Sequence, residues 1–305
     1  MKTFEELRNL QALPLDLKIK KTLQRIREWY KHWGGDVFVS FSGGKDSTVL
    51  LHLVRSLYPE VPAVFCDTGL EYPEVRKHVL TFPNVVMLKP KLNFRQVIEK
   101  YGWVYPNKDV AQTIYYARRG GGWAINAMQG LNPDGTRSYW KKTHYFKWRH
   151  LLDAPFKISS ECCHVMKIQP LDKFTKEMGR QAIIGTMAAE SNRRTMSWLQ
   201  NGCNAYDSKR PISKPLSFWL EQDVLYYIRE NNIPIADVYG EIIEKNGKLI
   251  TTGEKRTGCM FCLVGCHLDE ENKFQRMKET HYSMYKYCMN VLGLDKILSY
   301  LGIEH

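Results

Sequence analysis

Two sets of residues in this sequence have the types and spacing needed for chemistry: one glycine-rich turn and two groups of cysteines. The turn is SGGKDS at residues 42–47, which follows the apolar run VFVSF and precedes the apolar positions Val49, Leu50, Leu53 and Val54. Residues 36–41 are mostly β-branched or aromatic and predict a buried strand. The positions after Asp46 recur at helical spacing. SGGKDS is therefore predicted to be a strand-to-helix turn.

Such a turn suits an anion, because unpaired backbone N–H groups and the positive end of the helix dipole point at one place. Lys45 and the hydroxyls of Ser42 and Ser47 would complete a phosphate cradle. The turn is not a Walker A loop, since Val39 stands where the first glycine belongs and Asp46 replaces the Ser/Thr after the lysine. The alternative is an ordinary turn in which the glycines only pack closely.

A second predicted strand, residues 61–69, carries Asp67 and Thr68 at its carboxyl end. Ligands of open parallel sheets bind at that end of the strands. We therefore expect these two side chains on the same side of the sheet as the glycine-rich turn.

The cysteines form two groups, Cys162 with Cys163 and Cys259 with Cys262 and Cys266. Thiolates from two distant segments suit either a tetrahedral zinc ion or an iron–sulfur cluster, and buried thiols without metal are the third alternative. Neighbouring side chains diverge, which makes an adjacent pair awkward for one zinc ion. The isolated Cys66, Cys203 and Cys288 are predicted to be packing residues.

SGGKDS resembles the signature of the PP-loop ATP pyrophosphatases, which have the adenine nucleotide α-hydrolase fold. FCDTGLEYPEV at 65–75, IIGTMAAESNRR at 183–194 and PLSFWLEQDVLYYIRENNIP at 215–234 narrow the resemblance to the phosphoadenosine phosphosulfate (PAPS) reductase family. The resemblance implies an α/β fold, with a Rossmann-like parallel sheet and helices on both faces. It implies nucleotide contacts from Ser42, Gly43, Gly44, Lys45, Asp46, Ser47, Asp67, Thr68, Gly69, Gly185, Glu190 and Arg194. The catalytic residues it predicts are Lys45, Asp46, Asp67, Lys167 and Arg194.

The resemblance also assigns the cysteines. The pattern CC-x-x-x-K-x-x-P-L at 162–171, with the later Cys-x-x-Cys, resembles the sulfonucleotide reductases that carry a [4Fe–4S] cluster. It implies the ligands Cys162, Cys163, Cys259 and Cys262, with Lys167 near cluster and substrate. Cys266 is a fifth candidate, which could replace one of the tandem pair or remain a free thiol.

One departure from the family affects the predicted reaction. Sulfonucleotide reductases carry a nucleophilic cysteine in a C-terminal motif, whereas this sequence ends SYLGIEH. We therefore expect ATP as the nucleotide, with Mg²⁺, and adenylation-linked sulfur transfer to a nucleic acid, supplied by a sulfur-donor protein such as a cysteine desulfurase. The alternatives are a reductase of PAPS or adenylylsulfate that releases sulfite, and a non-catalytic nucleic-acid-binding subunit.

Residues 101–150 are rich in glycine, aromatic side chains and bases. The bases are Lys108, Arg118, Arg119, Arg137, Lys141, Lys142, Lys147 and Arg149, against the acids Asp109 and Asp134. Interleaved aromatic side chains can stack on unpaired bases while cations follow phosphates, with Arg118, Arg119, Lys141 and Lys142 as the predicted backbone contacts. The alternative is a lid whose tryptophans form a small core of their own.

The remaining chain must position these groups. Lysine and arginine outnumber aspartate and glutamate 44 to 32 among the 305 residues, an excess that attracts polyanions.

The first thirty residues contain no continuous apolar block. We therefore expect neither a signal peptide nor a membrane anchor, and we expect a cytoplasmic protein. We predict a helical segment at 1–35, a nucleotide-binding domain at 36–235 with the insertion at 101–150, and a C-terminal segment at 236–305 that completes the cluster.

Overall fold

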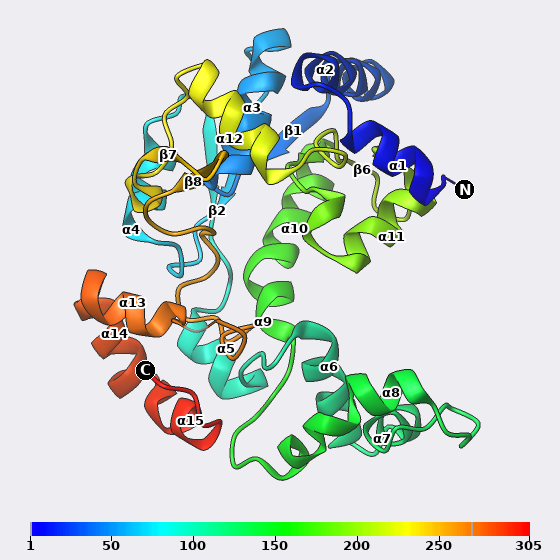
Figure 1. The fold of residues 1–305 in the computed structure, drawn as a ribbon, viewed down its shortest axis with the longest axis vertical. Coiled ribbons are helices and arrows are strands. Elements are labelled where there is room, and N and C mark those ends of the chain that lie inside the picture. Colours follow the sequence, from blue (N-terminus) through cyan, green and yellow to red (C-terminus); the bar gives the residue numbers. More distant parts are fainter. Residues whose placement is uncertain (1, 270) are drawn as a thin grey trace. The chain divides into compact units, whose positions relative to one another are not determined.

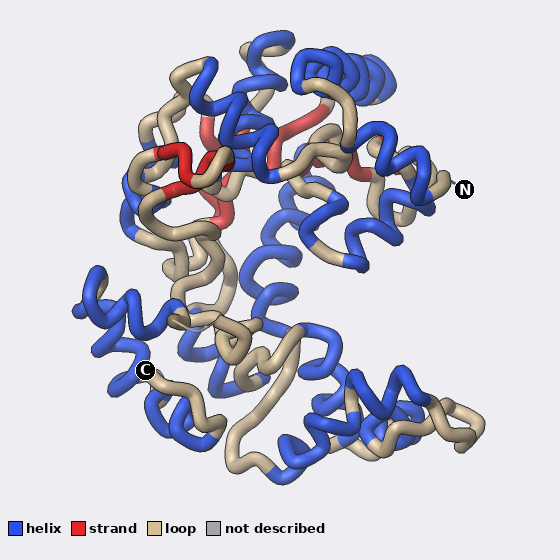
Figure 2. Tube along the Cα trace, in the orientation of Figure 1, coloured by secondary structure: helices blue, strands red, loops and turns tan. Residues whose placement is uncertain are grey.

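The computed structural model describes residues 2–269 and 271–305, which form two compact units. Unit 1 comprises Met1–Asp67, Glu71–Lys89 and Pro170–Thr257, and unit 2 comprises Thr68–Leu70, Pro90–Gln169 and Gly258–His305. Figure 2 shows that the strands belong to unit 1, whereas unit 2 consists of helices and loops. Each unit is described by itself.

Unit 1 carries the sheet. Its α-helices are α1 (Phe4–Gln11), α2 (Leu15–His32), α3 (Lys45–Leu57), α4 (Pro73–Leu80), α10 (Gln169–Met178, whose first residue falls in unit 2), α11 (Asn192–Asn201) and α12 (Glu221–Glu230), with short 3₁₀ turns at Ala188–Glu190 and Asp237–Tyr239. Its strands are β1 (Val37–Ser40), β2 (Ala63–Cys66), β3 (Val85–Leu88), β4 (Gln181–Ile184), β5 (Asn204–Ala205), β6 (Ile212–Ser213), β7 (Ile242–Lys245) and β8 (Lys248–Thr251).

Six strands form one sheet in the order β3-β2-β1-β4-β6-β5. All neighbours are parallel except β5, which runs antiparallel to β6. The chain moves outward from β1 through β2 to β3 and then returns to the other side of β1 as β4. The strand order therefore reverses between β1 and β4, and in open α/β sheets ligands bind in the crevice beyond the carboxyl ends of such strands.

Both faces of the sheet are covered, as the alternation along β1 shows. Val37 and Val39 are fully buried in a large core that also takes Ile26 of α2, Val49 of α3 and Val224 of α12. Phe38 points to the opposite face and packs against Phe174 of α10, with ring centroids 5.2 Å apart. Figure 1 shows these helices around the strands. The predicted α/β fold, a mostly parallel sheet with helices on both faces, is confirmed.

Unit 2 is built from helices. They are α5 (Phe94–Tyr101), α6 (Lys108–Ala117), α7 (Gly122–Met128), α8 (Tyr139–His144), a 3₁₀ helix at Phe146–Asp153, α9 (Glu161–Cys163) continuing into a π-helical turn at His164–Ile168, α13 (Lys273–Thr280), α14 (Tyr282–Lys286), a π-helical turn at Tyr287–Val291, and α15 (Leu294–Tyr300). The predicted domain boundary at 235/236 differs from the boundary between the two units. Residues 236–257 belong to unit 1, and residues 258–305 belong to unit 2.

Candidate functional site

The glycine-rich turn lies between β1 and α3, and two glycines, one in the turn and one beyond β4, come close to neighbouring chain atoms. Gly43 has φ +72°, and a Cβ atom there would stand 2.6 Å from a methyl carbon of Val79 and 2.7 Å from one of Val75. Gly185, just beyond β4, comes so close that a Cβ atom would be 3.1 Å from the carbonyl oxygen of Asp46. The ends of β1 and β4 therefore meet at the first turn of α3.

Hydroxyl groups organise this first turn. Ser42 Oγ and Ser47 Oγ are 3.0 Å apart, and Ser47 Oγ accepts a hydrogen bond from the backbone N–H of Ser42 at 3.2 Å. Ser47 Oγ also donates to the carbonyl oxygen of Gly44, the N-cap of α3, at 2.9 Å. The predicted strand-to-helix turn is thus formed, and the N-terminus of α3 has the geometry of an anion site.

Lys45 is held by residues that the sequence analysis missed. Its side chain is 4% exposed, and its ammonium donates to the carbonyl oxygen of Lys255 at 2.8 Å and lies 3.2 Å from Glu221 Oε1. Its backbone N–H donates to the hydroxyl of Tyr239 at 3.2 Å. That hydroxyl is 2.6 Å from Thr257 Oγ1. The signal in the sequence was the run Lys255-Arg256-Thr257, which Gly258 separates from Cys259.

Asp46 is the residue of the turn whose side chain lacks a hydrogen bond among the described residues. Its Oδ1 atom is enclosed and finds no hydrogen-bond partner in the described part of the chain. Burial raises the pKa of its carboxyl group, while Lys45, Arg256 and Arg194 oppose that rise. A buried oxygen without a donor is costly unless a ligand or metal ion satisfies it.

Lys45, Arg256 and Arg194 are the cations that act on Asp46, and Lys214 in turn lies near Arg194. Burial lowers the pKa of Arg194, and the nearby charge of Arg256 lowers it further. Burial and then the charge of Arg194 lower the pKa of Lys214, whose ammonium donates to Ser197 Oγ at 2.7 Å. Arg194 is also paired with Glu190. Like charges held this close favour an anion between them.

The other predicted nucleotide residues have different surroundings. Asp67, at the end of β2, pairs with Arg76 Nε at 3.0 Å and is 11% exposed. Thr68 and Gly69 belong to unit 2, where Thr68 Oγ1 accepts the backbone N–H of Leu70 at 3.2 Å. The structure therefore brings Ser42, Gly44, Lys45, Asp46, Ser47 and Gly185 together, and the roles of all these residues remain predictions.

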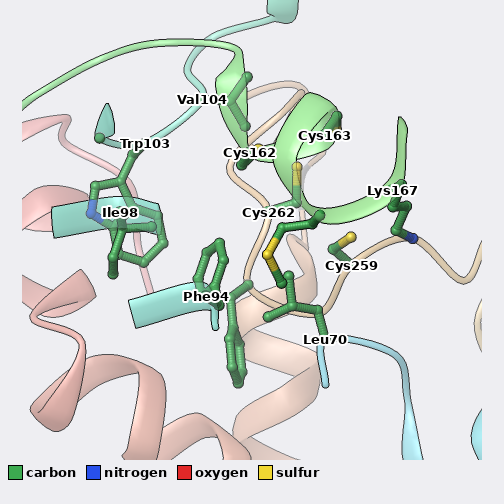
Figure 3. Close-up of a pocket in the computed structure, with 13 residues that line it drawn as sticks. Leu70, Phe94, Ile98, Trp103, Val104, Cys162, Cys163, Lys167, Cys259 and Cys262 are labelled. Carbon is green, nitrogen blue, oxygen red and sulfur yellow. The ribbon is translucent and has the colours of Figure 1, made fainter. Parts of the chain in front are cut away.

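The second site is a pocket in unit 2 (Figure 3). Its walls hold four thiols, those of Cys162, Cys163, Cys259 and Cys262, with Lys167 at the edge. The remaining walls are apolar: Leu70, Phe94, Ile98, Gly102, Trp103, Val104, Met166 and Phe261. The cavity itself has a volume of about 30 Å³, and the empty space counted together with open solvent is about 440 Å³. These are the four cysteines that the family resemblance selected.

The electrostatics around the tandem pair are asymmetric. The pKa of the Cys163 thiol is lowered, first by a hydrogen bond with Cys162 and then by the ammonium groups of Lys108 and Lys167. The pKa of Cys162 is raised by the same hydrogen bond and by burial. Lys108, at the start of α6, therefore contributes positive charge beside the Cys163 thiol.

Cys266 does not line the pocket. It is 2% exposed, and burial raises the pKa of its thiol to about 12. Cys66, Cys203 and Cys288 are buried as well. Over residues 2–269 and 271–305, no group of three or more Cys, His, Asp or Glu side chains is arranged to hold a single metal ion. Within the same ranges, no helix combines the length and apolar character needed to cross a bilayer.

Comparisons with known proteins place the chain in a family. The model of the phosphoadenosine phosphosulfate reductase domain matches residues 36–114 and 127–272. An uncharacterised protein of Methanocaldococcus jannaschii is 25% identical over 90% of this chain, and the chain spans only 52% of that protein's length. The adenosine 5′-phosphosulfate reductase of Staphylococcus epidermidis is 23% identical, over 85% of each chain.

A solved PAPS reductase from Candida auris, in a phosphate complex, covers 81% of this chain and 98% of its own, at 15% identity and a TM-score of 0.40. The family predicted from SGGKDS and the segments at 65–75, 183–194 and 215–234 is confirmed by the match of the family model, which includes all four. On that match, the chain belongs to the phosphoadenosine phosphosulfate reductase domain family.

Proposed function

We propose that this chain binds ATP with Mg²⁺ at the N-terminus of α3 and uses it to activate an oxygen atom of a nucleic acid for replacement by sulfur. The observation that carries the proposal is the turn at 42–47, where hydroxyls, a buried lysine and an unsatisfied carboxylate oxygen surround a helix N-terminus. A triphosphate supplies the negative charge that this arrangement favours.

The reaction balances in two steps. The acceptor oxygen attacks the α-phosphorus of ATP, the bond to the bridging oxygen breaks, and pyrophosphate leaves. A donor protein such as a cysteine desulfurase carries the sulfur as a persulfide, and two thiols of a reducing protein release it as sulfide while they become a disulfide. The sulfide then attacks the activated carbon, and AMP leaves with the oxygen. Lys45, Arg194 and Arg256 would stabilise the negative charge that develops on the phosphates. Lys45 would exchange its contacts with Lys255 and Glu221 for a phosphate oxygen.

Asp46 fits a magnesium ion. Mg²⁺ takes oxygen ligands and is commonly held by one or two carboxylates together with substrate phosphates and water. The enclosed Oδ1 atom, which has no donor among the described residues, would be the protein ligand. The raised pKa of Asp46 has the same origin, because burial disfavours the carboxylate more than the nearby cations favour it.

The pocket of unit 2 fits a [4Fe–4S] cluster, with Cys162, Cys163, Cys259 and Cys262 as its ligands. Four thiols around an apolar space suit an iron–sulfur cluster, which is larger than a single ion. Lys108 and Lys167 would balance the charge of the thiolates. A bound cluster would supply either a site for sulfide or a structural link between the two cysteine segments.

The cysteines outside the pocket are poorly placed to reduce a sulfonucleotide. Outside the pocket, every cysteine of the sequence is described, and each is at most 9% exposed: Cys66, Cys203, Cys266 and Cys288. A thiolate must reach the substrate sulfur to reduce it, and burial raises the pKa of Cys266 and Cys288 to about 12. Activation by ATP needs no such thiol.

A sulfonucleotide reductase is the second candidate. It is favoured by the Staphylococcus epidermidis adenosine 5′-phosphosulfate reductase, which matches over 85% of each chain. In that case a partner protein would supply the thiol.

The two candidates differ in their need for magnesium, and titration calorimetry with ATP and with adenylylsulfate tests this. We expect ATP to bind tightly only with Mg²⁺ and Asp46→Asn to weaken that binding at least about tenfold, the loss of one charge-assisted contact. Lys45→Ala should also weaken the binding of ATP, because the buried ammonium would contact a phosphate oxygen. Lys77→Ala is its matched control, since Lys77 is 79% exposed on α4 and should change nothing. Tight, Mg²⁺-independent binding of adenylylsulfate, with sulfite release and no pyrophosphate formed from ATP, would favour the reductase instead.

A further inference from the structure

The helical segment at 108–153 has an apolar interior of its own, which sorts its aromatic side chains into two kinds. Its buried residues include Val110, Ile114, Ala124, Met128 and Leu151. Tyr145 is also buried, and its hydroxyl donates to Asp109 at 2.7 Å. The segment therefore has buried apolar residues of its own beside its exposed aromatic side chains.

Four large aromatic side chains nevertheless face solvent. Tyr116 of α6 is 43% exposed, Trp123 of α7 50%, Tyr139 of α8 85% and Trp140 of α8 57%. Apolar rings of this size are seldom left in water without a use when they are grouped. The helices that carry them pack on one another, and Figure 1 shows α7 and α8 at the opposite end of unit 2 from α13–α15.

Three of these rings, those of Tyr116, Trp123 and Trp140, belong to two groups of contacting side chains. The centroids of Tyr116 and Trp123 are 5.7 Å apart, and the guanidinium of Arg119 lies 3.5 Å above the neighbouring ring of Tyr115. On α8, Trp140 stacks on His144 at 4.8 Å with an interplanar angle of 12°. Each group can offer a ring face to a planar ligand.

Eight basic side chains in the segment 108–153 stand against three acidic ones, Asp109, Asp134 and Asp153. Asp109 is occupied by Tyr145 and by His144 Nε2 at 3.1 Å, and Asp134 accepts the hydroxyl of Thr136 at 2.7 Å. Arg119, Lys142 and Arg137 are exposed, and Lys141 is half-buried. Within the described ranges none of these four makes an ion pair with a carboxylate. The segment therefore complements an anion.

Arg118 is the exception, and it corrects one sequence prediction. Its guanidinium donates to the carbonyl oxygens of Phe156, Leu151 and Ala154 at 2.7, 2.5 and 2.9 Å. Burial lowers its pKa. Arg118 is thus committed to the fold, and the prediction that it contacts a phosphate backbone is wrong.

We infer that Tyr116, Trp123, Tyr139 and Trp140, with Arg119, Arg137, Lys141 and Lys142, form a binding surface for single-stranded nucleic acid. Exposed rings stack on unpaired bases while the cations follow the phosphates, a combination that duplex DNA cannot use because its bases are already stacked. This inference rests on the nucleic-acid acceptor of the proposed function and names the surface that would hold it.

The test is fluorescence anisotropy of the full chain with a labelled oligonucleotide of about 20 nucleotides, over about 50–300 mM KCl. We expect the single strand to bind more tightly than the duplex of the same sequence. Trp140→Ala and Trp123→Ala should each weaken binding about 5- to 150-fold, the range for one lost stacking contact. Trp140→Phe should restore most of the loss. Replacing Lys141 and Lys142 by alanine should reduce the salt slope by about 1.4.

Tyr282→Ala is the matched control. Tyr282 lies on α14, is also 57% exposed, and has the ammonium of Lys286 5.5 Å from its ring centroid. Its loss should leave the affinity unchanged. The inference is overturned if both tryptophan variants bind as the wild type does, or if vesicles of anionic phospholipid are bound and the oligonucleotide is not.

Parallel assays of pyrophosphate release from ATP separate the two proposals. Oligonucleotide binding that depends on Trp140, without any turnover of ATP, would leave the surface standing and remove the proposed function. Turnover of ATP that nucleic acid stimulates and Trp140→Ala leaves unchanged would support the proposed function and remove the binding surface.

Discussion

Gly43 combines two constraints that can be measured separately. Its φ of +72° is unfavourable for any residue with a Cβ atom, and that atom would also overlap the methyl groups of Val79 and Val75. Gly34 has a φ of +58° with no heavy atom within 4 Å of its would-be Cβ. The two glycines thus share the backbone conformation, but only Gly43 has the close approach.

We predict that Gly34→Ala lowers the free energy of unfolding by about 1–2 kcal/mol, the cost of a left-handed backbone conformation. Gly43→Ala should cost about 1–3 kcal/mol more, because valine side chains must move. Urea unfolding measures both, and ATP binding should be weakened only by the change at Gly43. Equal losses in the two variants would mean that the contact with Val79 and Val75 relaxes without cost.

At the scale of elements, α2 is joined to α12 by an ion pair. Lys18 Nζ lies 2.6 Å from Asp223 Oδ2, and the two side chains are 2% and 14% exposed. The same carboxylate oxygen accepts the backbone N–H of Leu220, the N-cap of α12, at 2.7 Å. Asp223 therefore caps one helix and holds the other.

We predict that Lys18→Met destabilises unit 1 by about 3–5 kcal/mol, because a buried carboxylate loses its counter-ion. Lys20→Met is the control on the same helix. Lys20 is 72% exposed and lies 3.7 Å from Asp16, so its loss should change the stability by less than about 1 kcal/mol. Thermal unfolding of the two variants should differ clearly, and similar curves would show that Asp223 is solvated or otherwise neutralised.

At the scale of the whole chain, the cysteine pocket joins segments that are roughly 100 residues apart in sequence, 162–163 and 259–262. Each pair of thiols alone is an incomplete ligand set. A bound cluster would close this long loop and stabilise unit 2, as structural metal sites do.

We predict about four irons and four sulfides per chain in protein purified without oxygen. Cys162→Ser and Cys259→Ser should lose the iron and the visible absorbance, while Cys203→Ser, a buried thiol of unit 1, keeps both. Cys266→Ser should also keep the iron, because Cys266 does not line the pocket. Zinc in place of iron would assign the thiols to a structural metal ion.

Local patterns in the sequence were sufficient for the strand-to-helix turn at 42–47, whereas the parallel-sheet fold was implied by the family resemblance. The glycines, the β-branched strand before them and the helical periodicity after them all act over a few residues, so their consequence can be read without the rest of the chain. The family could be predicted for the same reason, since its signatures are contiguous segments.

Only the tertiary structure decided which groups surround these motifs. Tyr239, Lys255 and Thr257 reach the turn from segments about 200 residues away, and no local pattern marks them. The same holds for the sorting of residues 101–150, where Arg118 turns inward to backbone carbonyl oxygens and Trp140 turns outward to solvent. Residue type alone could not separate the two, because burial depends on which surfaces the folded helices present to one another.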